Sequence, residues 1–585
     1  MAALQVPHYR VAFDDRAQHL LRVSLTLPAP AAQQRLSLPV WLPGSYLLRE
    51  FARHLQDLRG TQAGRPVHIE QVDKTSWIAH CNGTAALELS WRVHALDGSV
   101  RGAWLDGERA FFNGSSLFLA ADGRTDGPQH LSLGRLPAGW DVATAMRRVA
   151  PGGPPRFEAD DYAELIDHPF ELGRFWCGQF DVAGVPHEFV VTGAWPGFDG
   201  ARLLADTTRI CRAQVRLWHG RGKPPFKRYV FLLRAGDDGY GGLEHRASTA
   251  LQAVRTDLPR VGQFAGTAAD DAGYQRLLGL ISHEYFHAWN VKRLTPVELA
   301  APDLGREAYT QLLWWFEGVT SYYDDLTLVR AGLVTPEAYL RLLASHLQTV
   351  AGTPGRQVQS VAQASFDAWT RYYRPDAHTP NGTVSYYAKG ALVAACLDLT
   401  LRRDGAGTLD DVLRRLWQLR RPITEADIAD AVAAVGGRSY RAELDDWVHG
   451  VGELPLPDLL RSMGVSARTE APGLAGRWGL RVQEAALTGV RVRHVLRGGA
   501  AEAAGVQPGD ELLAVDGWRL RRLDDAAAWL TPGAPATLLL TRDQRVLSCR
   551  VAPGDTLVPT WQLALAKGSD GDADTTARRR AWLGA

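Results

Sequence analysis

Two histidines with a carboxylate beside the first carry the strongest chemical signal in the sequence. His283, Glu284 and His287 form an H-E-x-x-H pattern. The preceding residues 274–282 have apolar side chains at helical spacing and no proline, which predicts a buried helix. Positions i and i+4 of a helix lie on one face, so both imidazoles could reach one ion. Catalytic zinc binds imidazole nitrogens and keeps one position open for water, beside which Glu284 would act as general base.

A catalytic zinc site of this kind needs a third protein ligand, and Glu317 is the candidate. It is the single carboxylate in the apolar, aromatic run Trp314–Tyr323. A buried charge is costly unless it is paired or binds a metal. We therefore expect His283, His287 and Glu317 to hold one Zn²⁺ per chain as a His2Glu site. The groups that could orient a ligand histidine are nearby hydroxyls and acids: Thr320, Ser321, Asp324 and Asp325.

The same residues also allow an interpretation without a metal. H-E-x-x-H is short enough to occur by chance, with its histidines capping or packing a helix. Glu317 would then face solvent from an amphipathic helix. The presence of a third ligand candidate on a second apolar helix favours the zinc site.

Length and composition restrict the class of protein. A chain of 585 residues is too long for one core and predicts about three domains. With 65 Lys and Arg against 64 Asp and Glu there is no basic field, so we expect no nucleic-acid partner. We also expect no membrane-spanning segment, because Asp398 interrupts the longest apolar run, Ala391–Leu401.

The N-terminus and the cysteines predict the compartment. Residues 1–13 lack a basic segment followed by an apolar one, so we expect no secretory signal. The five cysteines are scattered and have no C-x-x-C spacing, which is typical of reduced thiols. We therefore expect a cytoplasmic protein.

The order of strand and helix signals predicts a multidomain α+β protein. Short apolar runs alternate with Pro, Gly and Asn-Gly turns at the start, which predicts an N-terminal antiparallel β-domain over residues 1–170. Strand signals then give way to helical periodicity, so we predict a catalytic domain over residues 171–465, with a β-part followed by a helical part. The predicted helices are Tyr274–Asn290, Tyr309–Val329, Pro336–Val350, Ser385–Arg403, Leu409–Gln418 and Thr424–Val435.

A Pro- and Gly-rich stretch at residues 471–475 marks a further boundary. A small β-rich module is predicted over residues 474–556. Residues 557–585 form the remaining C-terminal segment or tail. Within it, residues 567–580 are polar and rich in Gly and Asp, which favours a flexible loop or tail.

The predicted zinc ligands resemble those of the gluzincin metallopeptidases, in which H-E-x-x-H is followed on the next helix by a ligand Glu. Phe316, Glu317 and Gly318 take the place of the N-E-G-like motif of many aminopeptidases in that group. The offset of 30 residues between His287 and Glu317 is similar to that of the glycyl aminopeptidase family, which carries a C-terminal PDZ domain. The resemblance implies a thermolysin-like (gluzincin) catalytic domain and a zinc peptidase.

Residues 239–245 look like the G-x-M-E-N-type motif of aminopeptidases, with Leu in place of Met and His in place of Asn. The resemblance implies that Glu244 receives the free α-ammonium group of the substrate. It also implies that the backbone at Gly241 and Gly242 pairs with the peptide like an added strand. The alternative is a Gly-rich hairpin whose Glu is merely exposed.

Residues 385–390 resemble the aminopeptidase Y-x-K-G motif. In that motif the tyrosine donates a hydrogen bond to the tetrahedral oxyanion, a task that suits a neutral phenol. By position the matching residue is Tyr387, with Tyr386 as the second choice. The alternative is a pair of core or surface aromatics at a helix start, and Lys389 receives no role.

Residues 499–517 resemble a PDZ domain, with a short helix, an A-G-V turn, a P-G-D turn, a strand and the hairpin turn Asp516-Gly517. PDZ domains bind extended chain ends by strand addition, so a peptide C-terminus is a possible partner, with residues 477–480 as the carboxylate-binding loop. A packed accessory domain without a ligand is the alternative. Residues 41–52 look like the same family's N-terminal domain, and we assign no chemistry to their Pro43-Gly44 turn.

These resemblances predict a cytoplasmic zinc-dependent aminopeptidase that hydrolyses the N-terminal residue of peptides. A preference for small residues such as Gly or Ala is implied by the family alone. One alternative is a zinc endopeptidase whose PDZ domain recruits the substrate. Another is a PDZ-led peptide-binding or chaperone-like protein with a degenerate peptidase domain.

Overall fold

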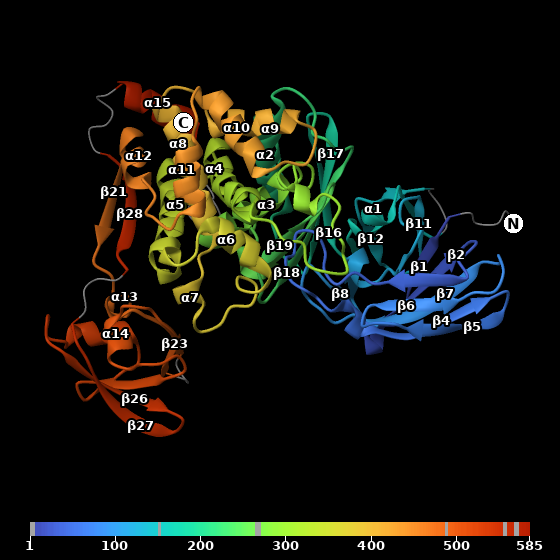
Figure 1. The fold of residues 1–585 in the computed structure, drawn as a ribbon, viewed down its shortest axis with the longest axis horizontal. Coiled ribbons are helices and arrows are strands. Elements are labelled where there is room, and N and C mark those ends of the chain that lie inside the picture. The colour runs from blue at the N-terminus through green and yellow to red at the C-terminus, as the bar shows by residue number, and fades with distance from the viewer. Residues whose placement is uncertain are drawn as a thin grey trace. The chain divides into compact units, whose positions relative to one another are not determined.

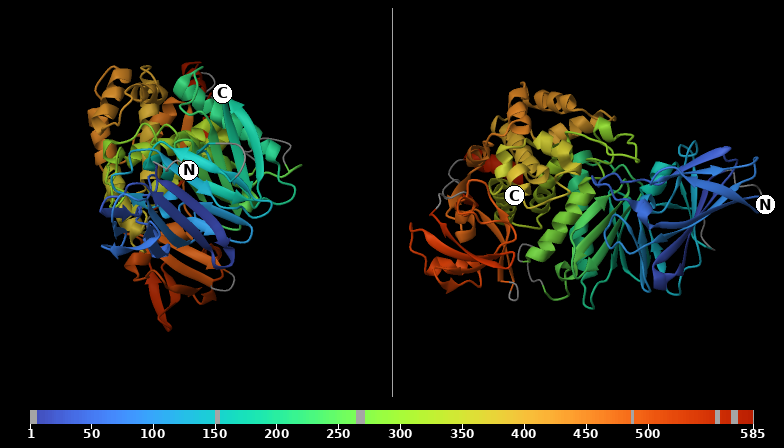
Figure 2. Two further views of the ribbon diagram at one scale, coloured as in Figure 1. Left: turned by 90° about the vertical axis from the view of Figure 1, so that its right-hand side faces the viewer. Right: turned by 60° about the horizontal axis from the view of Figure 1, so that its bottom comes forward.

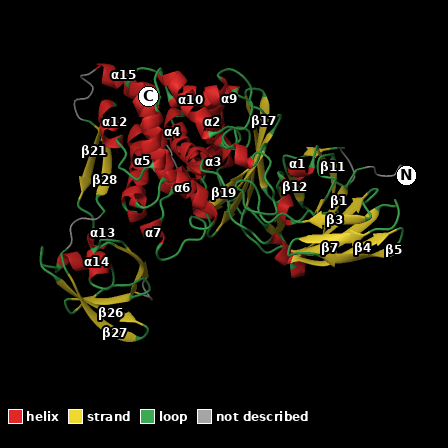
Figure 3. Ribbon diagram, in the orientation of Figure 1, coloured by secondary structure: helices red, strands yellow, loops and turns green. Residues whose placement is uncertain are grey.

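The computed structural model describes residues 6–149, 154–263, 271–485, 489–553, 558–566 and 573–584. The chain divides into two compact units, Met1–Ala308 and Tyr309–Ala585, which are described in turn. Figure 1 colours the chain from blue to red, and Figure 3 shows that strands dominate the first unit and helices the beginning of the second. Residues 567–572 of the predicted tail lie outside the described residues.

The first unit begins with a large, mostly antiparallel sheet, drawn in blue to cyan in Figures 1 and 2. Alternation of apolar and polar residues explains it: every second residue of β7 is buried, as expected for a sheet with one face on a core. In sheet order its strands are β10 (Ala120–Ala121), β3 (Gln33–Ser37), β6 (Ser76–His80), β5 (Arg65–Gln71), β4 (Leu55–Gln62), β7 (Leu87–His94), β2 (Leu20–Leu27), β1 (His8–Asp15), β11 (Gln129–Leu133), β14 (Arg156–Ala159) and β13 (Arg147–Arg148).

Two further sheets complete the first unit. The smaller contains β12 (Asp141–Ala143), β15 (Phe170–Gly173), β9 (Arg109–Phe112) and β8 (Ala103–Leu105). The other contains β16 (Trp176–Val182), β17 (Val185–Thr192), β18 (Tyr229–Gly236), β20 (Ser248–Val254) and β19 (Gly241–Glu244), in that order. Strand β19 is antiparallel to β20 and lies at the edge of the sheet. Helices α2 (Gly200–His219) and α3 (Ala272–Phe286) pack against this sheet, and α1 (Tyr162–Ile166) is a short helix before β15.

Helix α3 carries the first half of the H-E-x-x-H pattern. Asp271 caps its N-terminus by accepting a hydrogen bond from the backbone of Tyr274, and the leucines and isoleucine at the predicted apolar positions are buried. The helix ends at Phe286, with His287 as its C-cap, whereas the prediction extended it to Asn290. The chain instead tightens into a turn, in which the backbone of Ala288 donates to the carbonyl of Tyr285.

The second unit opens with the helix that carries Glu317. The predicted start at Tyr309 is wrong by several residues, and the first turns, Trp314–Val319, form a π-helix before α4 begins. Single π-helical turns inside helices are frequent at functional sites. The following helices are α4 (Thr320–Arg330), α5 (Pro336–Ala351), α6 (Val361–Phe366), α7 (Thr379–Gly382), α8 (Tyr386–Arg403), α9 (Leu409–Gln418), α10 (Glu425–Gly436), α11 (Arg441–Leu444) and α12 (Leu456–Ser462).

A small β-module follows in the second unit. Its hairpin turn at Asp516 and Gly517 has the positive φ values of 49° and 81° that a tight turn between adjacent strands requires. The elements are α13 (Leu474–Trp478), β22 (Leu480–Ala485), β23 (Gly489–Val495), α14 (Ala500–Ala503), β24 (Glu511–Val515), β25 (Trp518–Arg519), β26 (Ala536–Arg542) and β27 (Arg545–Val551). Strands β21 (Val465–Glu470) and β28 (Thr560–Leu565) pair separately.

The last described segment is a helix, α15 (Ala573–Leu583), rather than the loop or tail that its polar composition predicts. Trp582 explains the difference, because its side chain is fully buried and donates a hydrogen bond of 2.8 Å to the hydroxyl of Tyr322 on α4. The side chain of Arg330 also donates to the carbonyl of Trp582 at 3.0 Å. Tertiary packing of one aromatic side chain therefore orders a segment of low average hydrophobicity.

Candidate metal centre

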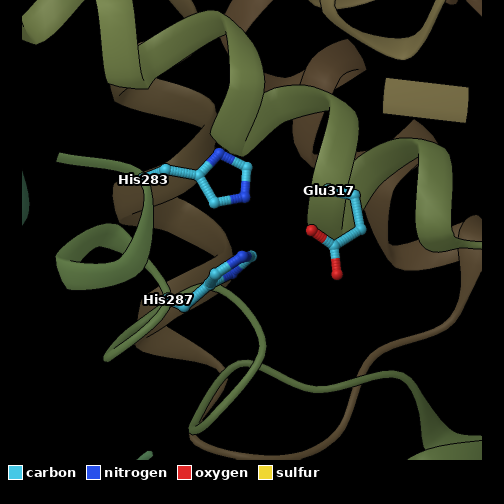
Figure 4. A group of neighbouring side chains, drawn as sticks. All are labelled: His283, His287 and Glu317. Atoms are coloured by element: carbon cyan, nitrogen blue, oxygen red, sulfur yellow. The ribbon is translucent and has the colours of Figure 1, made fainter. Parts of the chain in front are cut away.

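The three predicted metal ligands lie close together. His283 lies in the last turn of α3, His287 caps that helix, and Glu317 comes from the π-helical turn. Their ligand atoms all lie within 4.8 Å of one another, and Figure 4 shows the three side chains turned toward a common space. Tetrahedral zinc with bonds of ~2.1 Å places neighbouring ligand atoms roughly 3.4 Å apart, which falls within this limit. The alternative of unrelated helix-packing histidines does not predict this arrangement.

The surroundings of the ligands fit a zinc site as well. His287 and Glu317 are almost fully buried, at 1% and 2% exposure. The Nδ1 of His287 lies 2.7 Å from the carbonyl oxygen of Asn290, which can only accept, so Nδ1 carries the proton and Nε2 is left to bind a metal. The group that orients the Nδ1 of this histidine is therefore a backbone carbonyl. No side-chain motif could have revealed it.

Glu284 lies beside the ligands on the same helix and is 5% exposed. The edge strand β19 passes directly against it: a Cβ added at Gly242 would lie 2.5 Å from Cγ of Glu284. Real Cβ contacts are never this short, so glycine at this position permits the close approach. The sequence assigned Gly242 a backbone role toward substrate, and this packing role against the general base is an additional finding.

Glu244 follows two residues later on β19 and faces the same side of the strand as position 242, because side chains alternate. The two positions are therefore roughly 7 Å apart along the strand. Glu244 is 3% exposed, which contradicts the alternative of an exposed Glu on a hairpin. Its Oε1 is buried and has no hydrogen-bond partner among the described residues. A buried carboxylate oxygen in this state calls for a cationic or hydrogen-bond-donating ligand.

His245 replaces the Asn expected after Glu244 and points its Nδ1 at Asp167, 3.3 Å from Oδ1. Burial lowers the pKa of His245, although Asp167 opposes this effect. The imidazole is therefore neutral at pH 7, with its proton on Nδ1 toward the carboxylate. Asp167 also accepts a hydrogen bond of 2.7 Å from Nζ of Lys292. The Asp167 carboxylate therefore binds both the segment that follows the H-E-x-x-H pattern and the end of β19. No sequence motif predicted a role for either Asp167 or Lys292.

Tyr387 lies at the start of α8 in a group of four tyrosines. Its hydroxyl is 3.0 Å from that of Tyr373, which also accepts from Tyr386 at 3.3 Å. Tyr386 is fully buried, whereas Tyr387 is partly exposed, so Tyr387 is better placed to meet a ligand. Burial and the nearby charge of Glu317 raise the pKa of Tyr387 well above its usual range, which keeps the phenol neutral and able to donate.

Two glycines bring the Glu317 turn and the Tyr387 helix together. A Cβ at Gly318 would lie 2.5 Å from the Cα of Gly390, and one at Gly390 would lie 2.6 Å from the carbonyl oxygen of Trp314. The π-helical turn and α8 therefore touch backbone to backbone. The glycines of the two sequence motifs serve this close packing, which places Tyr387 near the Glu317 carboxylate.

Comparison with known proteins identifies the family. The Peptidase M61 N-terminal domain matches residues 8–174, the M61 glycyl aminopeptidase matches residues 276–393, and a PDZ domain matches residues 491–542. The crystal structure of an aminopeptidase N family protein from Idiomarina loihiensis is 32% identical, with a TM-score of 0.92, over 99% of this chain and 100% of that one. The chain belongs to the M61 glycyl aminopeptidase family.

An M1 zinc metallopeptidase from Deinococcus radiodurans is 14% identical, with a TM-score of 0.47, over 77% of this chain and 95% of that one. No curated protein matches the sequence. Family membership confirms the predicted resemblance, the α+β multidomain fold with a C-terminal PDZ domain, and the assignment as a metallopeptidase. Within the described residues, no helix has the length and apolar character needed to cross a membrane.

Proposed function

We propose that this M61 family member is a zinc-dependent aminopeptidase that removes the N-terminal residue of peptides, with a preference for small residues such as Gly or Ala. The observation that carries the proposal is the group formed by His283, His287 and Glu317, with ligand atoms within 4.8 Å of one another. Two imidazoles, a carboxylate and an open fourth position make a catalytic zinc site. We expect one zinc ion per chain.

When bound, zinc supplies a Lewis acid that polarises the scissile carbonyl and makes water more acidic. Glu284 takes the proton from the attacking water and later passes it to the leaving amine, since its carboxylate lies beside the ligands on α3. Tyr387 donates a hydrogen bond to the oxygen that becomes negative in the tetrahedral state, a role supported by its raised pKa.

Glu244 supplies the selection for a free amino terminus. Its buried Oε1, which has no partner among the described residues, would accept from the substrate's α-ammonium group. An ammonium–carboxylate hydrogen bond is ~2.8 Å long, and one residue of the substrate adds ~3.8 Å. Together these lengths are about equal to the distance between positions 244 and 242 along the strand. The scissile bond then falls next to Glu284, which touches Gly242.

The edge of β19 offers a backbone for the peptide to pair with. Gly241 and Gly242 would bind the substrate by strand addition, because β19 is the last strand of its sheet. The carbonyl of Gly242 already accepts from Arg101 at 3.0 Å, so pairing would use the neighbouring groups.

The PDZ domain would bind a peptide C-terminus, which remains a separate part of the proposal. The predicted carboxylate-binding residues 477–480 lie where α13 ends and β22 begins, and Gly479 has a φ of 73°. A cytoplasmic location is also proposed, consistent with five cysteines that are all free thiols.

The test is a panel of aminoacyl reporter substrates, free and N-acetylated, assayed with and without a chelator for the wild type and for Glu244→Gln. We expect cleavage of free glycyl and alanyl reporters only, full inhibition by the chelator, and a loss of about 10²-fold for Glu244→Gln. Cleavage of acetylated peptides at internal bonds, unchanged in Glu244→Gln, would instead support the endopeptidase alternative.

A further inference from the structure

The strand that carries Glu244 is held by residues from a distant part of the chain. We call Gly241–His245 the recognition strand. Besides β20 and Glu284, the strand is contacted by Gly44, Arg101 and Asp167, which lie in the segment matched by the Peptidase M61 N-terminal domain and belong to the first compact unit. They contact the strand at its middle, at its carboxylate and at its end.

The first contact is made by Gly44, which lies directly against the carboxylate of Glu244. A Cβ added at Gly44 would meet Oε1 of Glu244 most closely, and it would lie 2.6 Å from Oε2 and 2.7 Å from Cδ. The φ of Gly44 is +99°, a backbone conformation that other residues rarely adopt. Only glycine therefore allows the chain to pass so close to this carboxylate.

The turn around Gly44 is firmly anchored. Trp41 is fully buried, and its Nε1 donates to the carbonyl of Arg306 at 2.8 Å. On the other side of the turn, Arg49 donates to the hydroxyl of Ser45 at 2.7 Å. Displacing the turn would disturb these partly buried contacts, so the carboxylate of Glu244 has a fixed neighbour.

Two charged residues hold the rest of the recognition strand. Arg101 donates from Nη2 to the carbonyl of Gly242 at 3.0 Å. Asp167 accepts from Nδ1 of His245 and, at 2.9 Å, from the backbone N–H of Arg246. Burial opposes ionisation of Asp167, yet the charge of Lys292 holds its pKa well below the usual range, so it binds the strand end as an anion.

We propose that the Pro43–Gly44 turn forms one wall of the subsite for the substrate's α-ammonium group, and that Gly44 is the positioning residue for Glu244. This inference rests on the proposed function, in which Glu244 binds that group. The turn lies against both oxygens of the carboxylate, and Oε1, which has no hydrogen-bond partner among the described residues, would accept from the N–H donors of the ligand. The ligand class is a primary α-ammonium, since an acylated terminus offers no charge to the carboxylate.

The experiment compares Gly44→Ala with Gly64→Ala in the full-length protein. Gly64 has a similar φ of +75° but nothing within 4 Å of an added Cβ, so it controls for backbone strain. Binding of glycinamide, with N-acetylglycinamide as the blocked control, is measured by calorimetry. We expect Gly44→Ala to weaken glycinamide at least ten-fold relative to Gly64→Ala, with unchanged zinc content and a comparable Tm.

Glu244→Asp provides the rescue, because its shorter side chain withdraws the carboxylate from the added methyl group. The double variant Gly44→Ala/Glu244→Asp should bind glycinamide at least five-fold more tightly than the product of the two single losses predicts. Losses that simply multiply, or a Gly44→Ala variant that behaves like Gly64→Ala, overturn the inference. If Gly44→Ala does not fold, the inference requires that the double variant folds and binds glycinamide. A double variant that does not fold also overturns the inference.

Glu244→Gln separates this inference from the proposed function. If Glu244→Gln binds glycinamide as the wild type does, ammonium recognition by Glu244 is wrong and both fall. If Glu244→Gln weakens glycinamide whereas Gly44→Ala matches Gly64→Ala, only the role of the turn falls.

Discussion

The metal-binding segment, His283–Asn290, and the recognition strand, Gly241–His245, position their functional side chains in different ways. In the first, helical spacing sets two ligands one turn apart, and a carbonyl three residues further on orients the second. In the second, the partners Asp167 and Arg101 are 78 and 141 residues away in the sequence. A sequence motif predicts the geometry of residues that are close in the chain, but it does not predict contacts with residues that are far away in the chain.

The largest expected effect belongs to the metal-binding segment. Glu284→Gln should lower kcat by about 10³-fold on every cleavable substrate, because proton transfer is lost while the ligands stay in place. Zinc content and KM should hardly change. Steady-state kinetics on several aminoacyl reporters would measure this, and retention of a tenth of the activity would contradict the assignment.

Tyr387→Phe should cost about 10²–10³-fold in kcat, because one oxyanion donor is removed. Tyr386→Phe is the matched control, since Tyr386 is adjacent but fully buried. A larger loss in the control would transfer the role to Tyr386. Like Glu284→Gln, and unlike Glu244→Gln, this change should affect kcat rather than ligand affinity.

Gly242→Ala tests the contact between the two regions. The added methyl group must displace the Glu284 carboxylate, and a displacement of ~1 Å can cost about 10²-fold in kcat. Gly127→Ala is the control, because a Cβ there meets nothing within 4 Å. Equal kinetics for both variants would show that β19 does not constrain the general base.

The smallest effect concerns stability behind the metal-binding segment, where His187 Nε2 accepts from the hydroxyl of Tyr285 at 2.9 Å. Burial lowers the pKa of His187 to about 4, against 6.5 when unfolded. A lowered histidine pKa stabilises the fold above the unfolded value, and this contribution is lost as pH falls from about 6.5 toward 4.

At pH 5 the loss should be about 2 kcal/mol of unfolding free energy relative to pH 8. His187→Gln cannot titrate, so its unfolding free energy should depend less on pH. Denaturant unfolding of both proteins in chelator, which removes any contribution from metal release, measures the difference. Identical pH dependence in the two proteins would contradict the lowered pKa.

Much of the site was predictable from particular residues. The i, i+4 spacing of His283 and His287 and the lone carboxylate Glu317 in an apolar run predicted the group that the fold brings together. The π-helical turn was not predicted, and neither was the close backbone approach of Gly318 and Gly390 beside it. Sequence patterns report periodicity and do not report which helix lies opposite.

In the fold, too, local patterns were predictable and tertiary contacts were not. Alternating and helical patterns predicted the strands and helices, whereas α15 was missed because one buried side chain, Trp582, outweighs a polar composition. The Pro43–Gly44 turn received no chemistry for a similar reason. Its meaning depends on Glu244, which is remote in sequence and touches it only in the folded chain.

The most direct test of the central claim is zinc titration into chelated protein, followed by hydrolysis of a free glycyl reporter and by metal analysis. We expect no activity without metal and a rise to a plateau at one zinc per chain. We also expect that His287→Ala and Glu317→Gln no longer retain stoichiometric zinc. Full activity in the chelated wild type, or stoichiometric zinc in both variants, would contradict the His2Glu centre.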